Sequence, residues 1–308
     1  MAAGWRFELY SFDFAAGAIL LATIAAWTFG TFGSDLSFVD RVAVAGLRSQ
    51  AFAMAGGFIF SIGNTLLMAT IALLGMSAAF PLVISTMLVV WSLAGSTNAR
   101  LPFLTLGVIA LVAAAVLTIF ARYQRPARKA MGKRSTPDPI RKSTKGIVTG
   151  IMAGILMGLA YPLAEMSFWG DLGLGAYAGL LMFCIGMVIS TALFSLYFLN
   201  IAIEGGRLPL SAYLRGTVRQ HLFGLAGGAL WAVGTLCWLL AQSTPLAQQP
   251  GYAITLVAAE GSVLLAVFWG MIAWGEFRGT LPRSRLRISL AIVCFCAGLG
   301  CLAFQFSR

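Results

Sequence analysis

Short polar segments divide the sequence into long apolar stretches, and this pattern limits the chain to few folds. Charged residues make up only 10% of the chain and hydrophobic residues 59%, whereas soluble domains have about 25% charged residues. About 20 apolar residues in a helix cross the roughly 30 Å hydrocarbon core of a bilayer. The stretches do not alternate like barrel strands, and lone strands leave their backbone unsatisfied in lipid. The sequence therefore predicts an all-α polytopic membrane protein.

We expect nine transmembrane helices. They cover residues 12–31, 51–72, 76–94, 102–121, 146–166, 174–199, 221–241, 252–274 and 288–306. Most of the 35 glycines lie inside these apolar segments, where small residues let helices pack closely in lipid.

Lysine and arginine are distributed unevenly between the predicted loops. If the basic segment 122–145 is cytoplasmic and the helices alternate, seventeen basic residues lie inside and four lie outside. Cytoplasmic loops carry an excess of Lys and Arg. The distribution predicts a cytoplasmic N-terminus and an external C-terminus, in what we expect to be a bacterial inner membrane. It also accounts for the net charge of +11, so we predict no nucleic-acid partner.

The residues that support metal, redox or hydrolytic chemistry are scarce. The five cysteines all lie in apolar stretches, and His221 is the single histidine. We therefore expect free buried cysteines, no metal site and no cofactor. A membrane enzyme would need a nucleophile–base pair or a metal cluster near one membrane face, and the sequence offers neither, so we expect no catalytic residues.

Two segments have nearly the same sequence. FAMAGGFIFSIGN, residues 52–64, and FGLAGGALWAVGT, residues 223–235, share a phenylalanine, an alanine and three glycines at a constant offset of 171 positions. Five predicted spans separate the two copies along the chain, so equivalent helices cross in opposite directions. The sequence therefore predicts an inverted repeat, a common plan of secondary transporters that places the solute site between the halves.

The predicted halves are unequal. Residues 1–121 form a half-repeat of four helices, residues 122–145 form a basic linker, and residues 146–308 form a half-repeat of five helices. Helix 146–166 has no equivalent in the first half. We expect the sequence to lack the first helix of a ten-helix parent; a nine-helix protein is the alternative.

Four segments carry a family resemblance: FAMAGGFIFSIGN, GMSAAFPLVIST (75–86), GRLPLSAYLRG (206–216) and GYAITLVAAEGSVLLAVFWGMIAWGEFRG (251–279). They resemble the ureide permease family, which stands beside the bacterial glucose/ribose porters in the drug/metabolite transporter superfamily. The resemblance spans about residues 6 to 306. It implies two inverted five-helix repeats and proton-linked movement of small polar solutes; plant members carry allantoin and nucleobases, and relatives carry sugars. The chain departs from the plant pattern at Glu260, where plant relatives tend to have an uncharged polar group.

Two glutamates are candidates for proton coupling. Glu260 lies about nine residues into helix 252–274, where a charge costs about 2.5–3.5 kcal/mol on insertion scales. It could load and release a proton or bind the solute; the alternative is a protonated acid bonded to a neighbouring helix. Glu165 lies at the end of helix 146–166. The alternative to a coupling role is that it is simply an exposed acid at a helix end.

Polar and aromatic side chains inside the spans predict a solute-binding site. The candidates are Asn64, Thr235, Trp231, Tyr161, Ser85 and Glu260. The Asn64 amide donates and accepts hydrogen bonds at once, although an interhelical hydrogen bond would explain it equally well. Trp231 could stack on a flat solute or simply fill the core.

These features favour a secondary transporter of a small, largely neutral polar solute such as a ureide, a nucleobase or a sugar. Its expected partners are the lipid bilayer, the solute, protons as coupling ion, and a second copy of the chain in a homodimer. The alternatives are an exporter of amphipathic metabolites or drugs and a membrane subunit without transport activity.

Overall fold

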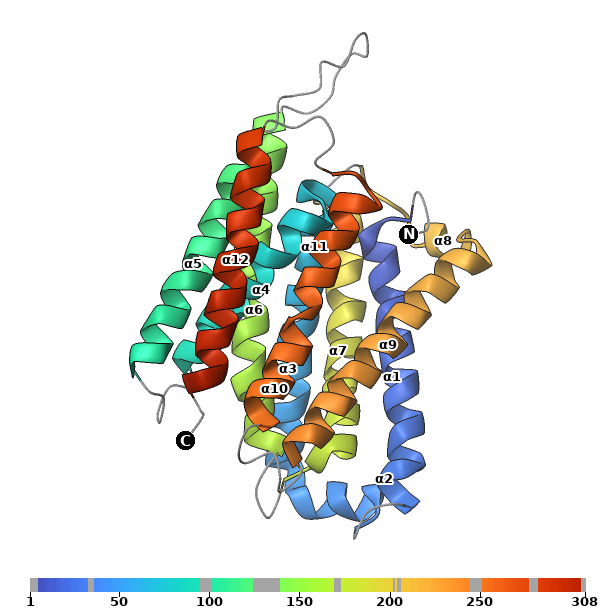
Figure 1. Ribbon diagram of the computed structural model, residues 1–308. Helices are drawn as coiled ribbons and strands as arrows, with labels where there is room; N and C mark the ends of the chain where they lie inside the picture. Colours follow the sequence, from blue (N-terminus) through green and yellow to red (C-terminus); the bar gives the residue numbers. More distant parts are fainter. Residues whose placement is uncertain are drawn as a thin grey trace. The chain divides into compact units, whose positions relative to one another are not determined.

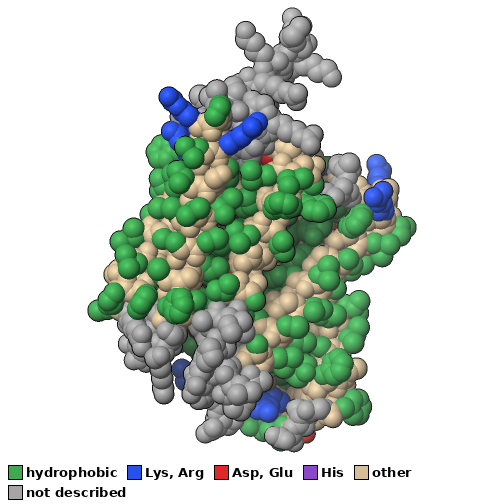
Figure 2. Space-filling model, in the orientation of Figure 1, with side chains coloured by type: hydrophobic (Ala, Val, Ile, Leu, Met, Phe, Trp, Pro, Cys, Tyr) green, Lys and Arg blue, Asp and Glu red, His purple; other side chains and the backbone are tan. Residues whose placement is uncertain are grey.

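The computed structural model describes residues 5–32, 36–94, 101–123, 139–168, 173–201, 203, 206–243, 251–276 and 282–305. Within these residues the secondary structure is entirely helical (Figure 1). Eight of the described helical segments are long and apolar enough to cross a membrane. Hydrophobic side chains cover most of the surface visible in Figure 2, with Lys and Arg in a few places. The chain is an all-α polytopic membrane protein, as its sequence predicts.

The chain folds into two compact units, and each combines residues of both predicted halves. Unit 1 comprises Met1–Thr65 and Leu159–Gln248, and unit 2 comprises Leu66–Gly158 and Gln249–Arg308. Unit 1 contains the first part of α3 and the end of α6. Unit 2 contains the rest of those two helices.

Unit 1 is built mainly from four long helices. Its elements are α1 (Phe7–Trp27), α2 (Phe29–Phe32), α3 (Phe38–Leu74) up to Thr65, α6 (Pro139–Phe168) from Leu159, α7 (Gly175–Asn200), α8 (Ser211–Leu214) and α9 (Val218–Ser243). Helix α1 packs against both α7 and α9. Helices α3 and α9 run in opposite directions, and so do α1 and α7 (Figure 1).

Reciprocal glycines bring α3 and α7 into close contact. A Cβ atom on Gly57 would overlap the carbonyl oxygen of Phe183, and one on Gly186 would overlap the carbonyl oxygen of Met54. Each helix therefore presents a glycine to the backbone of the other. Such contacts require the absence of a side chain, which explains the glycine in the AGG motif of the first copy.

A matching pair of glycines brings α1 and α9 together. A Cβ atom on Gly228 would overlap the carbonyl oxygen of Phe14, and one on Gly17 would overlap the carbonyl oxygen of Leu225. The α3 and α9 residues in these two crossings differ by 171 positions, and the α1 and α7 residues differ by 169. Exchanging α3 with α9 and α7 with α1 thus converts one crossing into the other.

Unit 2 contains the remaining helices. They are α4 (Met76–Ala94), α5 (Leu101–Tyr123), α10 (Gly251–Glu260), α11 (Ser262–Ile272) and α12 (Pro282–Gln305), together with the rest of α3 and α6. Helices α5 and α12 pack along each other, and Gly107 and Gly298 face each other in their contact.

A carboxylate caps the start of α4. The chain turns at Gly75, whose φ of 88° suits glycine. The backbone N–H groups of Met76 and Ser77 then donate to the two carboxylate oxygens of Glu276, at 2.7 and 3.0 Å. The hydroxyl of Ser77 donates to the same carboxylate. Glu276 therefore satisfies backbone donors that every helix start leaves open, and this explains the glutamate in the WGEFRG motif.

The predicted helix 252–274 is divided into two segments, α10 and α11, which meet at Gly261. Gly261 has helical dihedrals, with φ −60° and ψ −19°, and its N–H donates to the carbonyl of Val257 at 2.8 Å in the i to i−4 pattern. Leu264 N–H donates to the carbonyl of Gly261 at 2.9 Å, a tighter bond than that pattern. The backbone is therefore locally tightened directly after Glu260 and stays helical through this position.

Two other predicted boundaries also need correction. The linker 122–145 is shorter than predicted, because α6 begins at Pro139 and includes the last basic residues; residues 124–138 lie outside the described part. Proline is well tolerated in the first turn of a helix. The helix predicted at 51–72 is preceded by a shorter helical segment that begins at Phe38. The two are separated at Gly46, whose φ of 68° and ψ of 170° are not helical. The sequence analysis missed this shorter segment, which contains charged residues.

Candidate functional site

Unit 1 contains a small, partly open pocket, and the volume of about 420 Å³ that encloses it includes open solvent. Helices α3, α6, α7 and α9 line it with Phe60, Tyr161, Ala164, Glu165, Phe168, Leu180, Phe183, Trp231, Thr235, Trp238 and Leu239. The α6 and α9 residues recur at helical spacing, so each helix contributes one face. Four residues predicted as site residues from the sequence lie together here: Tyr161, Glu165, Trp231 and Thr235.

Trp231 forms the aromatic wall of this pocket with two phenylalanines. Its ring lies 5.1 Å from that of Phe60 at an interplanar angle of 28°, and 6.2 Å from that of Phe183 at 30°. Phe14 approaches it at 5.9 Å and 48°. These contacts hold the indole in one orientation, so Trp231 both packs in the unit and lines the pocket.

The sequence did not identify Phe60, although one signal pointed to it. Phe60 occupies the position in the first motif that Trp231 occupies in the second, at the 171-residue offset. A phenylalanine in an apolar segment is not recognised as a site residue from the sequence, because it has no polar group. The two equivalent residues now stack on each other.

A second aromatic pair belongs to α6 and α9. Tyr161 meets Trp238 edge to face, with ring centroids 5.9 Å apart and an interplanar angle of 87°. Trp238 lies one helical turn beyond Thr235 and shares its face, a spacing that could have indicated it from the sequence.

Only a few polar groups accompany these rings. They are the Thr235 and Tyr161 hydroxyls, the Glu165 carboxylate and the indole N–H groups. Small-molecule pockets typically have mostly apolar walls with few polar groups that orient the ligand. The lining of this pocket has that composition.

The other predicted site residues do not line this pocket. Asn64 is half-buried on α3, one turn beyond Phe60 on the same face. Ser85 and Glu260 belong to unit 2. Ser85 is buried in α4, and its hydroxyl has no hydrogen-bond partner among the described residues. Glu260 is half-buried at the end of α10.

The described residues contain no group of three or more His, Cys, Asp or Glu side chains that could hold a metal ion. The five cysteines are free thiols, as predicted, but only Cys184 is buried in the structure. The prediction of burial was wrong for the other four, which lie on the partly or fully exposed faces of their apolar helices.

No family model matches the sequence. A solved structure described as "Crystal structure of protein" is similar to this chain, with a TM-score of 0.47 and 14% sequence identity over 96% of this chain and 88% of that chain. This likeness is too weak to transfer a fold or a function.

Proposed function

We propose that the protein is a secondary transporter that binds a small, largely neutral solute in the aromatic pocket of unit 1. The observation that carries this proposal is the convergence of Tyr161, Glu165, Trp231 and Thr235 on one pocket. They come from helices α6 and α9, which are distant in sequence.

The chemistry of the pocket favours a planar solute over a sugar. Trp231 stacks with Phe60 in a nearly parallel arrangement, and a flat conjugated ring or ureide could pack on such a surface. Thr235 and Glu165 supply a hydroxyl and a carboxyl group, which can pair with the N–H and C=O groups along the edge of an amide-like ring. A nucleobase or a ureide is therefore the proposed solute class.

Helix packing supports alternating access through an inverted repeat. The two glycine crossings in unit 1 are related by the exchange of α3 with α9 and of α7 with α1, and both exchanged pairs are antiparallel (Figure 1). Inverted repeats are a common plan of secondary transporters. We propose membership in the ureide permease-like branch of the drug/metabolite transporter superfamily on these grounds together with the sequence motifs.

Protons are the proposed coupling ion. Glu165 lies in the pocket wall, where a change in its protonation would alter solute binding directly. Glu260 is an ionisable group within the apolar helical segment Leu256–Ile272, and ionisable residues inside membrane spans often mark ion or solute pathways. We propose insertion in a bacterial inner membrane, with the basic segment before α6 in the cytoplasm.

Export of an amphipathic metabolite is a second candidate function. The pocket has six aromatic rings and few polar groups, which would also suit an apolar ring system. The exporter differs from the transporter proposed above in the direction of transport and in the polarity of its solute.

A thermal-shift screen of the purified protein against ureides, nucleobases, nucleosides, sugars and planar amphipathic compounds tests the proposal. Stabilisation by a nucleobase or a ureide supports it. Stabilisation by amphipathic compounds alone would favour the exporter, and stabilisation by sugars alone would contradict the proposed solute class.

A further inference from the structure

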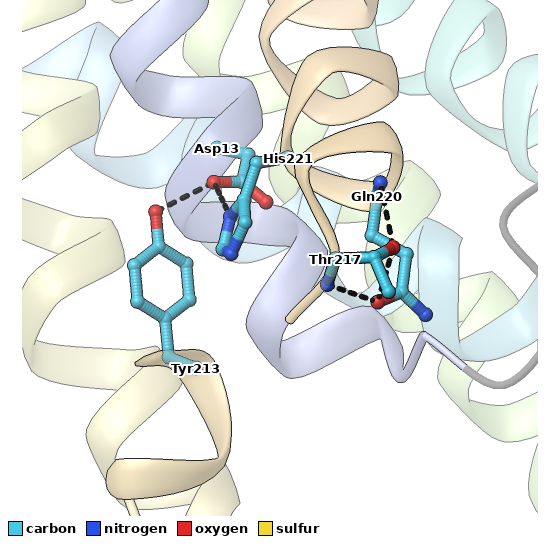
Figure 3. Close-up of polar contacts among 5 residues, drawn as sticks. All are labelled: Asp13, Tyr213, Thr217, Gln220 and His221. Atoms are coloured by element: carbon cyan, nitrogen blue, oxygen red, sulfur yellow. Dashed lines mark hydrogen bonds and ion pairs between the residues drawn. The ribbon is translucent and has the colours of Figure 1, made fainter. Parts of the chain in front are cut away.

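A buried carboxylate at the start of the α9 span is shared by two proton-bearing side chains. Asp13 on α1 is 1% exposed. Its Oδ1 atom accepts a hydrogen bond from the Tyr213 hydroxyl at 2.5 Å and lies 2.9 Å from Nδ1 of His221 (Figure 3). Tyr213 is in α8 and His221 is in the first turn of α9, about 200 positions along the chain.

The second oxygen of Asp13 has no such partners. Its Oδ2 atom is buried and has no hydrogen-bond partner among the described residues. It lies against Gly224, where an added Cβ would collide with the Asp13 side chain. Gly224 therefore leaves space for the carboxylate while offering it no donor.

This arrangement favours a proton on the Asp13–His221 pair. A buried anion that receives donors on one oxygen alone is poorly compensated, and an unpaired buried charge is strongly unfavourable. The charge is balanced if His221 is an imidazolium beside the carboxylate, or if Asp13 itself is protonated. Either state holds one proton on the pair.

The charged groups on neighbouring elements do not neutralise the carboxylate of Asp13. Helix α7, which packs on α1, contains no Asp, Glu, Lys, Arg or His. Glu8 is buried but forms an ion pair with Arg6 at 2.5 Å. The remaining ionisable groups on the packed elements are Tyr10 on α1, the exposed Arg215 and Arg219 next to or on α9, Cys237 on α9, and Tyr177, Cys184 and Tyr197 on α7.

Exposure differs across the cluster in a way that suits proton exchange. The His221 side chain is 25% exposed and that of Asp13 is 2% exposed, so the imidazole can pass a proton between the surface and the carboxylate. Desolvation, followed by the hydrogen bond to Asp13 and the charge of Asp13, raises the pKa of Tyr213 to about 12. Tyr213 therefore stays a donor at neutral pH and positions Asp13.

We infer that Asp13 and His221 form a proton-binding site, held in place by Tyr213 and separate from the solute pocket. Its role in coupling proton movement to transport rests on the function proposed above; proton binding itself does not. Uptake places the proton on the Asp13–His221 pair, and release returns it to water through the exposed imidazole.

Because His221 is the only histidine, NMR can observe this site without assignment. The full chain, purified with a histidine-free tag and labelled with ¹³C,¹⁵N-histidine, is titrated in detergent as wild type and as Asp13→Asn. The inference predicts that the midpoint of the His221 titration moves in the variant. An unmoved midpoint would overturn it.

Two further variants serve as a control and as a second test of the Asp13–His221 contact. Arg219→Gln changes an exposed charge on the same helix as His221 and should leave the midpoint in place. Tyr213→Phe removes one donor to Asp13 and should move the midpoint less than Asp13→Asn does. If Asp13→Asn fails to fold, an unmoved midpoint in Tyr213→Phe overturns the inference.

A transport measurement tests the coupling role. With a solute that the wild type carries, Asp13→Asn should lose stimulation by a pH gradient while retaining solute counterflow. Full stimulation in the variant would overturn the coupling role. A wild type that carries no solute would instead defeat the proposed function and leave the NMR result standing.

Discussion

Phe60 and Trp231 stack with ring centroids 5.1 Å apart and planes inclined by 28°. They occupy equivalent positions of two sequence motifs that are 171 residues apart. In the proposed inverted repeat, equivalent residues that touch would lie near the pseudo-symmetry axis, where the halves of an inverted-repeat transporter form their solute site. The stacked pair is therefore part of both the proposed repeat and the proposed solute site.

Replacing Trp231 by alanine should weaken solute binding about tenfold to a hundredfold, because stacking of a base on an aromatic side chain contributes about 1–3 kcal/mol. Equilibrium binding of the solute found in the screen measures the effect. Trp231→Phe should retain most of the affinity.

Trp269 provides the matched control for this substitution. It is 59% exposed and belongs to unit 2, so Trp269→Ala should leave the dissociation constant unchanged. Equal losses in the two alanine variants would show that Trp231 has no special role in binding.

The glycine crossings should tolerate no side chain. Gly57→Ala and Gly228→Ala each place a methyl group on a carbonyl oxygen of a neighbouring helix, and overpacking of this kind costs about 1–3 kcal/mol. Both variants should have lower unfolding temperatures in detergent.

Gly234 is the control on the same helix. An added Cβ at Gly234 meets nothing within 4 Å, so Gly234→Ala should keep or raise the unfolding temperature, since alanine favours helix. Destabilisation of Gly234→Ala equal to that of Gly228→Ala would argue against the crossing as the cause.

The helix cap at α4 gives a local prediction. Glu276→Ala removes the acceptor for the N–H groups of Met76 and Ser77, and loss of a cap costs about 0.5–2 kcal/mol. Hydrogen exchange of these two amides should accelerate, while exchange in the middle of α12 should not change. Unchanged protection of Met76 and Ser77 would mean that the carboxylate is dispensable.

Glu165→Gln and Glu260→Gln test the proposed coupling residues. Each variant cannot release a proton, so each should lose accumulation driven by a pH gradient while retaining solute counterflow. The comparison is made in proteoliposomes with and without the gradient. A variant with normal gradient-driven uptake excludes its residue from coupling.

Much of the helical architecture could be predicted from the sequence because the apolar stretches are long and lipid restricts the backbone to few structures. The predicted helix 76–94 matches α4 (Met76–Ala94). The helix predicted at 51–72 was correct, but the helical segment that precedes it, from Phe38 and separated from it at Gly46, was missed because its sequence contains charged and polar residues.

The site was only partly predictable. Trp231 and Thr235 stood out as large or polar side chains inside an apolar helix. Asp13 and Tyr213 did not, because they are 200 residues apart and only the folded chain shows their contact. Glu276 was part of a recognised motif, but its target is the start of a helix 199–200 residues earlier, which no local pattern reveals.

The central claim is that the Trp231 pocket binds the transported solute. Uptake of labelled nucleobases, allantoin and sugars into proteoliposomes with an inward proton gradient tests it most directly, with wild type and Trp231→Ala compared at equal protein content. We predict accumulation of a nucleobase or a ureide by the wild type and a loss of about tenfold or more in the variant. Equal uptake by both proteins, or no uptake of any tested solute by the wild type, would contradict the claim.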